Sequence, residues 1–167
     1  MFNLTRAGYY ADFALLPALV LLLLAWHFGA ALIWCFGGFM AWTLAEYLIH
    51  RFVFHHVPLL RRDHDRHHRE PSAYIGAGSW ITLPIFGLLW LGARWLLGGG
   101  GDAVAIGFAA GYYLYIAVHD QFHHARPRPG DWLYPAFHRH TLHHRQDKIN
   151  FGVSVPWWDL AFGTYRR

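Results

Sequence analysis

The sequence predicts an all-α, polytopic membrane protein in which four transmembrane helices carry a histidine-rich helical cap on the cytosolic side. Three observations lead to this fold class. Hydrophobic residues make up 55% of the 167 residues and charged residues only 14%, against about 25% charged in a typical soluble domain. Long apolar segments follow one another along the chain. The cationic and histidine residues gather at one end of these segments, and we expect residues 1–167 to form a single domain.

The apolar segments predict where the transmembrane helices lie. Residues 8–50 are almost continuously apolar, and at about 1.5 Å per residue this run is about twice as long as a hydrocarbon core near 30 Å requires. We therefore divide it at residues 27–30, where Gly29 suits a tight turn. The sequence GGGGD at 98–102 is interpreted as a flexible connection between two further segments. The predicted spans are residues 8–27, 30–50, 74–97 and 103–122.

The positions of Lys and Arg predict the orientation in the membrane. With four spans, both termini and the segments 51–73 and 123–167 lie on one side. That side carries 13 of the 14 Lys and Arg residues. The exception is Arg94. The positive-inside rule makes it the cytoplasmic side. We interpret the basic residues as orientation signals and contacts with anionic lipid heads, and we expect no nucleic-acid partner.

The histidines follow the same sidedness, and their spacing is regular. Of 14 histidines, only His27 falls on the far side. HDRHH at 64–68 and HTLHH at 140–144 repeat one pattern, and HDQFH at 119–123 shares part of it. Residues at i, i+3 and i+4 share one helix face, with Cβ atoms roughly 5–6 Å apart. In HRFVFH at 50–55 the two histidines lie about 140° apart on an ideal helix, so we expect a helix end or a bend there.

So many imidazoles on one side predict a metal site. Imidazole is the commonest metal ligand in proteins, and ten of them facing one volume would oversupply one ion, so two ions fit better. The sequence contains no HExxH motif, no nucleophile elbow and no phosphate-binding glycine loop, which argues against the corresponding hydrolases and nucleotide-binding enzymes. Two irons in a nitrogen-rich shell at a membrane surface suit oxygen activation, with the protein supplying position and excluding water.

The order of these motifs resembles the integral-membrane fatty acid hydroxylase and sterol desaturase superfamily. HRFVFH, HDRHH, HDQFHH and HTLHH follow one another, and NFGVSVPWWDLAFGT at 150–164 is similar to the family's closing segment. The resemblance runs from about Glu46 to the C-terminus. It implies two iron ions, O2 as co-substrate and an external electron donor. Since a nitrogen-rich site binds zinc at least as well as ferrous iron, we expect zinc to be a possible substitute after purification. The implied reaction is hydroxylation of a membrane lipid, a fatty acyl chain in the first place, at an unactivated C–H bond.

The resemblance also implies a set of ligands and how they are shared. The ten ligands carried over are His50, His55, His64, His67, His68, His119, His123, His140, His143 and His144. By similarity to membrane desaturases, one ion takes His50, His55, His68 and His144, and the other takes the rest. The histidines left outside are His27, His56, His124 and His138, with His124 an alternative to its neighbour. Polar residues near the ligands are candidates for orienting imidazoles, namely Glu46, Asp63, Asp65, Asp120 and Asn150.

Three alternatives remain open at this point. The short gap between His55 and His64, and the chain length, also resemble bacterial carotenoid hydroxylases, so a carotenoid or sterol hydroxylase is possible. A desaturase of the same superfamily is another outcome of the same oxidant. A non-enzymatic, histidine-rich metal-binding membrane protein is disfavoured, because a transporter needs polar residues at mid-membrane depth. Since nothing here resembles a cytochrome b5 domain, the expected redox partner is a separate ferredoxin, cytochrome or reductase.

Small and aromatic residues complete the expectations. Gly107 and Gly111, with Ala109 and Ala110 between them, are predicted to let the fourth helix approach a neighbour closely. Trp132 and the pair at 157–158 flank the histidine region in the sequence. We expect them to lie at the depth of the lipid headgroups, where tryptophan is enriched.

Overall fold

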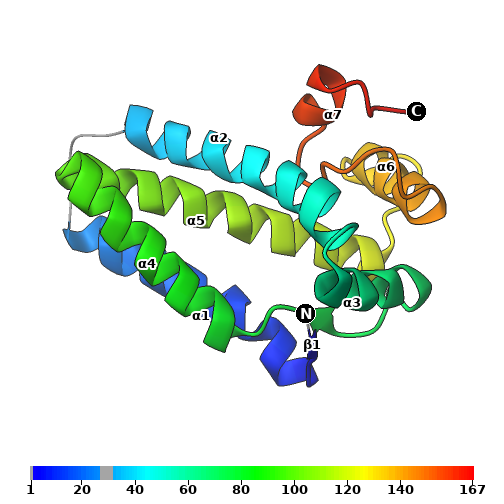
Figure 1. Ribbon diagram of the computed structural model, residues 1–167, viewed down its shortest axis with the longest axis horizontal. Helices are drawn as coiled ribbons and strands as arrows, with labels where there is room; N and C mark the ends of the chain where they lie inside the picture. The colour runs from blue at the N-terminus through cyan, green and yellow to red at the C-terminus, as the bar shows by residue number, and fades with distance from the viewer. Residues whose placement is uncertain (1, 27–31) are drawn as a thin grey trace. The chain divides into compact units, whose positions relative to one another are not determined.

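The computed structural model describes residues 2–26 and 32–167, and it is mostly helical (Figure 1). The predicted division at residues 27–30 and His27 itself lie outside the described residues. The elements are β1 (Phe2–Asn3), α1 (Arg6–Trp26), α2 (Leu32–Leu48), η1 (Ile49–Phe54), α3 (Pro58–Arg69), β2 (Ile75–Gly76), α4 (Ser79–Leu97), α5 (Gly99–Asp120), η2 (Gln121–Ala125), α6 (Tyr134–Arg145) and α7 (Trp157–Ala161).

The chain forms two compact units. The first, called the span unit, comprises residues Phe2–Trp42 and Gly76–Tyr113. The second, called the histidine unit, comprises Thr43–Ile75 and Leu114–Arg167. Helices α2 and α5 each begin in the span unit and end in the histidine unit. The two units therefore share two continuous helices, and each is described in turn.

Three helical stretches are long and apolar enough to cross a membrane. They are Leu32–Phe54, Ser79–Leu97 and Gly99–Ala125. Their outward surfaces are apolar, as on α4, where Trp80, Leu88 and Trp95 are exposed. These candidate spans correspond to the second, third and fourth predicted spans, with shifted ends. Helix α1 covers nearly all of the predicted span 8–27, and the count of four spans stays a prediction.

Glycines let α2 and α5 pack backbone against backbone within the span unit (Figure 1). A Cβ at Gly107 would overlap the carbonyl of Cys35, and one at Gly38 would overlap the carbonyl of Val104. A Cβ at Gly111 would press into the Trp42 side chain. The predicted close approach at Gly107 and Gly111 is confirmed, and it uses the small-residue packing typical of membrane helices.

A buried carboxylate joins three helices of the same unit. Asp12 on α1 accepts hydrogen bonds from Ser79 Oγ at 2.6 Å and Thr82 Oγ1 at 3.0 Å, both on α4. It accepts a third from Tyr112 OH on α5 at 3.0 Å. A buried charge is tolerated only when such partners satisfy it. Asp12 therefore links α1 to α4 and α5 through hydrogen bonds.

The GGGGD connection differs from the prediction. Only Gly98 lies in a turn, with φ at +57°, and α5 already begins at Gly99. Asp102 explains the early start, because its negative charge in the first helical turn complements the helix dipole. Its carboxylate is buried and accepts hydrogen bonds from Trp90 Nε1 at 2.7 Å and from the Arg94 guanidinium at 2.6 Å. Arg94, expected on the far side from the other cations, thus has an internal partner.

The histidine unit has its own small apolar core. Val118 and Phe122, where α5 passes into η2, pack with Val153 of the closing segment. Partly buried residues surround them, namely Leu114, Tyr115, Leu133, Ala136 and Phe137. This cluster holds the end of α5 against α6 and residue 153. Both α5 and α6 carry histidine motifs.

Candidate metal centre

A π-helix brings His50 and His55, which are five residues apart, onto nearly the same face of the chain. The sequence HRFVFH required a departure from α-helical geometry, and η1 provides it immediately after α2. In a π-helix the backbone bonds run from i to i+5, so residues five apart come to lie on nearly the same face. The centroids of the two imidazole rings are 5.2 Å apart, and the angle between the ring planes is 22°. Such π segments occur frequently at functional sites, and the second one, η2, carries His123.

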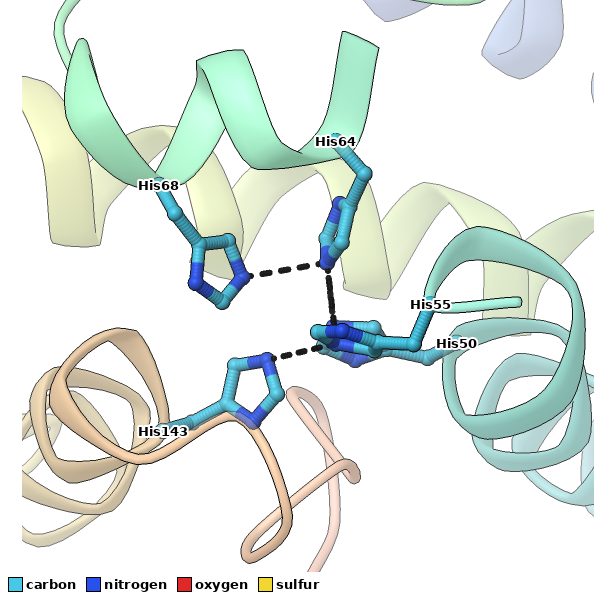
Figure 2. A group of neighbouring side chains, drawn as sticks. All are labelled: His50, His55, His64, His68 and His143. Atoms are coloured by element: carbon cyan, nitrogen blue, oxygen red, sulfur yellow. Dashed lines mark hydrogen bonds between the residues drawn. The ribbon is translucent and has the colours of Figure 1, made fainter. Parts of the chain in front are cut away.

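The ten predicted histidines come together as two groups of five. Within each group, one ring nitrogen from every histidine lies within 4.8 Å of the others. The first group takes residues from η1 and its C-terminal end, α3 and α6, and Figure 2 shows its imidazoles converging from these elements. It consists of His50, His55, His64, His68 and His143. The second group consists of His67, His119, His123, His140 and His144.

The nitrogens of the first group are too close and too many to satisfy one another by hydrogen bonds. His64 Nε2 lies 3.1 Å from Nε2 of His50, of His55 and of His68 (Figure 2). A neutral imidazole nitrogen either carries one hydrogen or offers one lone pair, so it cannot bond three others at once. Two nitrogens at right angles around one ion, each near 2.1 Å from it, would be about 3.0 Å apart. The spacing therefore fits a shared cation.

The second group gives the same indication. Nε2 of His123 lies 3.0 Å from that of His119 and 2.9 Å from that of His140. Both ring nitrogens of His67 and Nε2 of His144 are buried without a hydrogen-bond partner. Buried polar atoms normally have partners. A metal ion at each group would satisfy these nitrogens, so the residues present fit the dimetal centre that the sequence predicted.

Two backbone carbonyls fix which nitrogen faces the centre. His50 Nδ1–H donates to the carbonyl of Phe151 at 2.6 Å, and His143 Nδ1–H donates to the carbonyl of Ile149 at 2.7 Å. Because a carbonyl can only accept, Nδ1 carries the proton in both rings. Nε2 is then the unprotonated nitrogen that offers its lone pair to a metal. The segment 149–151 thus orients two histidines of the first group.

Buried carboxylates hold that segment in place. Asp159, fully buried, accepts from the backbone N–H of Phe151 at 2.8 Å and of Gly152 at 2.7 Å. Glu46 on α2 accepts from the backbone N–H of Val153 at 2.6 Å and from the backbone and hydroxyl of Ser154. The carboxylates therefore act on the ligands through the backbone. Asn150, with φ at +53°, adds a bond from its amide to the Arg166 carbonyl at 3.0 Å.

Burial keeps the imidazoles of the two groups that come from α3 and α6 neutral at physiological pH. Loss of hydration, with repulsion among neighbouring imidazoles added, lowers the pKa of His68 to about 3. Burial likewise lowers the pKa of His144 to about 4. The pKa values of His64, His67, His140 and His143 are lowered for the same reasons. Metal binding requires unprotonated imidazole, so these side chains are ready for it at pH 7.

The structure changes several details of the site. The grouping differs from the partition implied by the resemblance, because the ring nitrogens of His64 and His143 lie with that of His50, while that of His144 lies with that of His67. The geometry of helix α3 explains this, because consecutive residues are about 100° apart around an α-helix, so His67 and His68 lie on opposite sides of His64, with His68 the nearer of the two. Three histidines left outside the ligand set are also outside both groups, namely His56, His124 and His138.

The polar residues proposed to orient imidazoles have various contacts, and one important residue was missed. Asp65 lies 3.5 Å from Arg61, and Asp120 lies 3.5 Å from His124. Glu46 and Asn150 support the closing segment, as described above. Sequence reasoning overlooked Asp159. Its signal was an isolated carboxylate in the apolar, aromatic stretch VPWWDLAF, where a charge needs a structural purpose.

Comparison with known proteins identifies the family. The family model described as fatty acid hydroxylase matches residues 35–164. The chain belongs to the fatty acid hydroxylase family. The match contains every histidine of the two groups and the closing segment, so the resemblance expected from the motifs is confirmed.

Family members with related sequences share part of their length with this chain. The human fatty acid 2-hydroxylase is 34% identical over 140 residues, which cover 74% of this chain and 37% of that protein. The dihydroceramide fatty acyl 2-hydroxylase FAH2 of Arabidopsis thaliana is 28% identical over 142 residues, covering 75% of this chain and 57% of that protein. This chain therefore spans about a third to somewhat over half of the length of these relatives.

A solved family structure has the same fold. It is full-length Scs7p, of which only the hydroxylase domain is visible. The TM-score is 0.75 at 23% identity, and the likeness covers 96% of this chain and 67% of that one. The likeness confirms the predominantly helical fold class.

Proposed function

We propose that the two histidine groups bind two iron ions and that the chain hydroxylates a fatty acyl chain of a membrane lipid at the 2-position, next to the carbonyl, with O2. The observation that carries this proposal is the pair of five-nitrogen groups, because such a ligand-rich site exceeds what hydrolytic zinc needs. Related proteins named as fatty acid 2-hydroxylases and dihydroceramide fatty acyl 2-hydroxylases supply the substrate and the position.

The proposed hydroxylation consumes the acyl substrate, O2, two electrons and two protons. One C–H bond becomes C–OH, the second oxygen atom leaves as water, and two electrons and two protons are consumed. When bound, iron would supply the activation of O2 and the oxidising power toward the C–H bond. The electrons must come from outside, so we propose a separate protein donor, such as a ferredoxin, a cytochrome or a reductase.

The chain's own residues would hold and orient this chemistry. Each group would hold its ion through five imidazole nitrogens. The carbonyls of Ile149 and Phe151 lock two rings in the tautomer that would ligate through Nε2. Asp159 holds the peptide that bears the Phe151 carbonyl, and Glu46 holds the next one along the chain. The burial of the imidazoles excludes water from the site, which limits loss of the oxidant to side reactions.

The proposed placement puts the site at the cytoplasmic membrane surface. The predicted orientation follows from the Lys and Arg distribution. Both groups lie at or beyond the C-terminal ends of the candidate spans Leu32–Phe54 and Gly99–Ala125. A membrane lipid would then bring its acyl chain from the bilayer while the electron donor approaches from the cytoplasm.

Isotope labelling tests the proposal. Cells expressing the chain under ¹⁸O2 should accumulate a 2-hydroxy acyl lipid that carries one ¹⁸O atom, and cells supplied with H2¹⁸O instead should show none. The His67→Ala/His143→Ala variant, which disrupts both groups, should form no product, whereas His138→Ala should behave as wild type. A product labelled from water, or product formation by the double variant, would contradict the proposal.

A further inference from the structure

A cavity in the histidine unit adjoins the first histidine group. Its volume is about 470 Å³, and its wall includes Arg51, Phe52, His55, Arg61, Lys148 and Phe151. Small-molecule sites typically have volumes of about 300–1,000 Å³. His55 belongs to the first group, and the Phe151 carbonyl holds His50 of that group. An occupant of this cavity would therefore lie beside a proposed metal ligand.

The wall carries uncompensated positive charge. Three cations and one carboxylate, Asp147, line the cavity. Within the described parts of the chain, no carboxylate lies within ion-pair distance of Arg51 or Lys148. Arg61 has only an exposed contact to Asp65 at 3.5 Å, which is worth little in water. The cavity thus attracts an anion.

Arg51 is held in place for such a role. Its guanidinium lies 5.0 Å from the ring centroid of Phe52 and 5.7 Å from that of Phe151. It donates one hydrogen bond to Tyr47 OH at 2.6 Å, which leaves other N–H groups of the guanidinium available. The aromatic rings and the planar cation together offer one apolar and one charged surface. This combination suits an amphiphile with an oxyanion head.

The cavity also adjoins a membrane-crossing segment. Arg51 and Phe52 belong to the last turn of the candidate span Leu32–Phe54, and the Phe52 side chain is exposed. A lipid could therefore place its head in the cavity while its chain stays at the membrane. A protein partner would need a broad accessible face, whereas this site is a small recess at the end of a span. The location favours a lipid head as the occupant.

We propose that this cavity binds the oxyanion head of the lipid substrate, through Arg51, Arg61 and Lys148. The inference rests on the proposed function, because oxidation at the 2-position requires the carbonyl end of the substrate to lie next to the metals. The carboxylate of a free fatty acid is one bond from the reacting carbon, and a phosphorylated head supplies the same oxyanion chemistry from farther away. A neutral, ceramide-like head would gain nothing from the three cations.

Binding measurements on the full chain in detergent micelles test this. The ligands are palmitate, hexadecyl phosphate and neutral methyl palmitate, at a pH near 8.5 where the free carboxyl is ionised. The variant Arg61→Gln/Lys148→Gln removes two exposed cations from the cavity wall. Arg62→Gln/Arg145→Gln is the matched control, because it removes two exposed cations elsewhere in the same unit. Asp147→Asn removes the repelling carboxylate.

The expected pattern depends on the charge of the ligand. Loss of the two cations should weaken palmitate binding about five- to twentyfold, leave methyl palmitate unchanged and abolish most of the salt dependence. The control should bind as wild type. Asp147→Asn should tighten palmitate binding, a gain that a folding defect cannot produce. A larger effect on hexadecyl phosphate than on palmitate would assign the head as a phosphate.

Other outcomes overturn the inference. Equal losses for palmitate and methyl palmitate would mean that the cations act through the fold. Unchanged binding in all variants would remove the head site, and unchanged binding with slower reduction by an electron donor would reassign the cavity to that donor. Because the binding measurements need no bound metal and no turnover, failure of the head site and failure of the proposed oxygen chemistry are distinguishable.

Discussion

At the residue scale, the ten histidines that form the two groups could be predicted, and the residues that support them could not. Histidine is rare enough, and the HxxHH spacing regular enough, that the sequence alone selects all ten. Asp159 supports the histidines indirectly, because its carboxylate accepts hydrogen bonds from the backbone N–H groups of Phe151 and Gly152 and from the Thr164 hydroxyl. The partners of a backbone bond leave no trace in side-chain spacing. The assignment of His64 and His144 to different groups likewise depends on how helices α3 and α6 face one another.

Asp159 provides a test of the indirect support. Asp159→Asn removes the charge and one of the two acceptors that hold the segment carrying the Phe151 carbonyl. We expect metal affinity to fall about 10- to 100-fold, as for other residues that orient ligands, and the folded state to lose about 1–3 kcal/mol. Competition with a chelator measures the first and thermal unfolding the second. Asp131→Asn, which removes an exposed acceptor of a backbone N–H, should change neither.

The pKa values of His68 and His144 predict how pH affects the metal-free protein. Folding lowers them from the ordinary 6.5 to about 3 and about 4. Below pH 6.5 the unfolded chain takes up protons that the folded chain refuses, so stability falls as the pH falls from 6.5 toward 4.

Thermal unfolding of the metal-free protein across this pH range measures the effect. The unfolding temperature should drop on acidification. The drop should be smaller in His68→Gln/His144→Gln, which lacks two of the responsible groups. An unfolding temperature independent of pH would show that these imidazoles are not held neutral in the folded protein.

At the element scale, hydrophobic length predicted the long helices well, and local backbone chemistry caused the errors. The four glycines at 98–101 suggested a loop, but Asp102 and its partners Trp90 and Arg94 stabilise the helix start. The spacing of His50 and His55 signalled an irregularity without naming it as a π-helix. A π-helical turn depends on the tertiary contacts that a side chain must make, and the periodicity of the sequence does not reveal those contacts.

The contact between α2 and α5 gives a prediction at this scale. In Gly107→Ala the added methyl group would overlap the Cys35 carbonyl, so the helices must separate. We expect a loss of about 1–3 kcal/mol of stability, seen as a lower unfolding temperature in detergent. Gly87→Ala on α4 is the control, since its Cβ meets nothing within 4 Å. Equal behaviour of the two variants would refute backbone contact at Gly107.

At the scale of the whole molecule, the orientation rests on the charge distribution. A cysteine placed at Gly99, in a Cys35→Ala background, should react with an impermeant thiol reagent from the non-cytoplasmic side of intact cells. A cysteine at Arg145 should react only after the membrane is opened. Both positions tolerate a side chain, because a Cβ at Gly99 meets nothing within 4 Å and Arg145 is exposed. The reverse labelling pattern would invert the topology.

The division of ten histidines into two independent groups is the central claim, and metal content tests it most directly. The full chain, purified anaerobically from iron-supplemented cells, should contain about two irons, one for each group. His143→Ala and His67→Ala should each lose the metal of one group and keep about one iron, and the double variant should keep none. Metal-free wild-type protein, or single variants that retain both irons, would contradict the account.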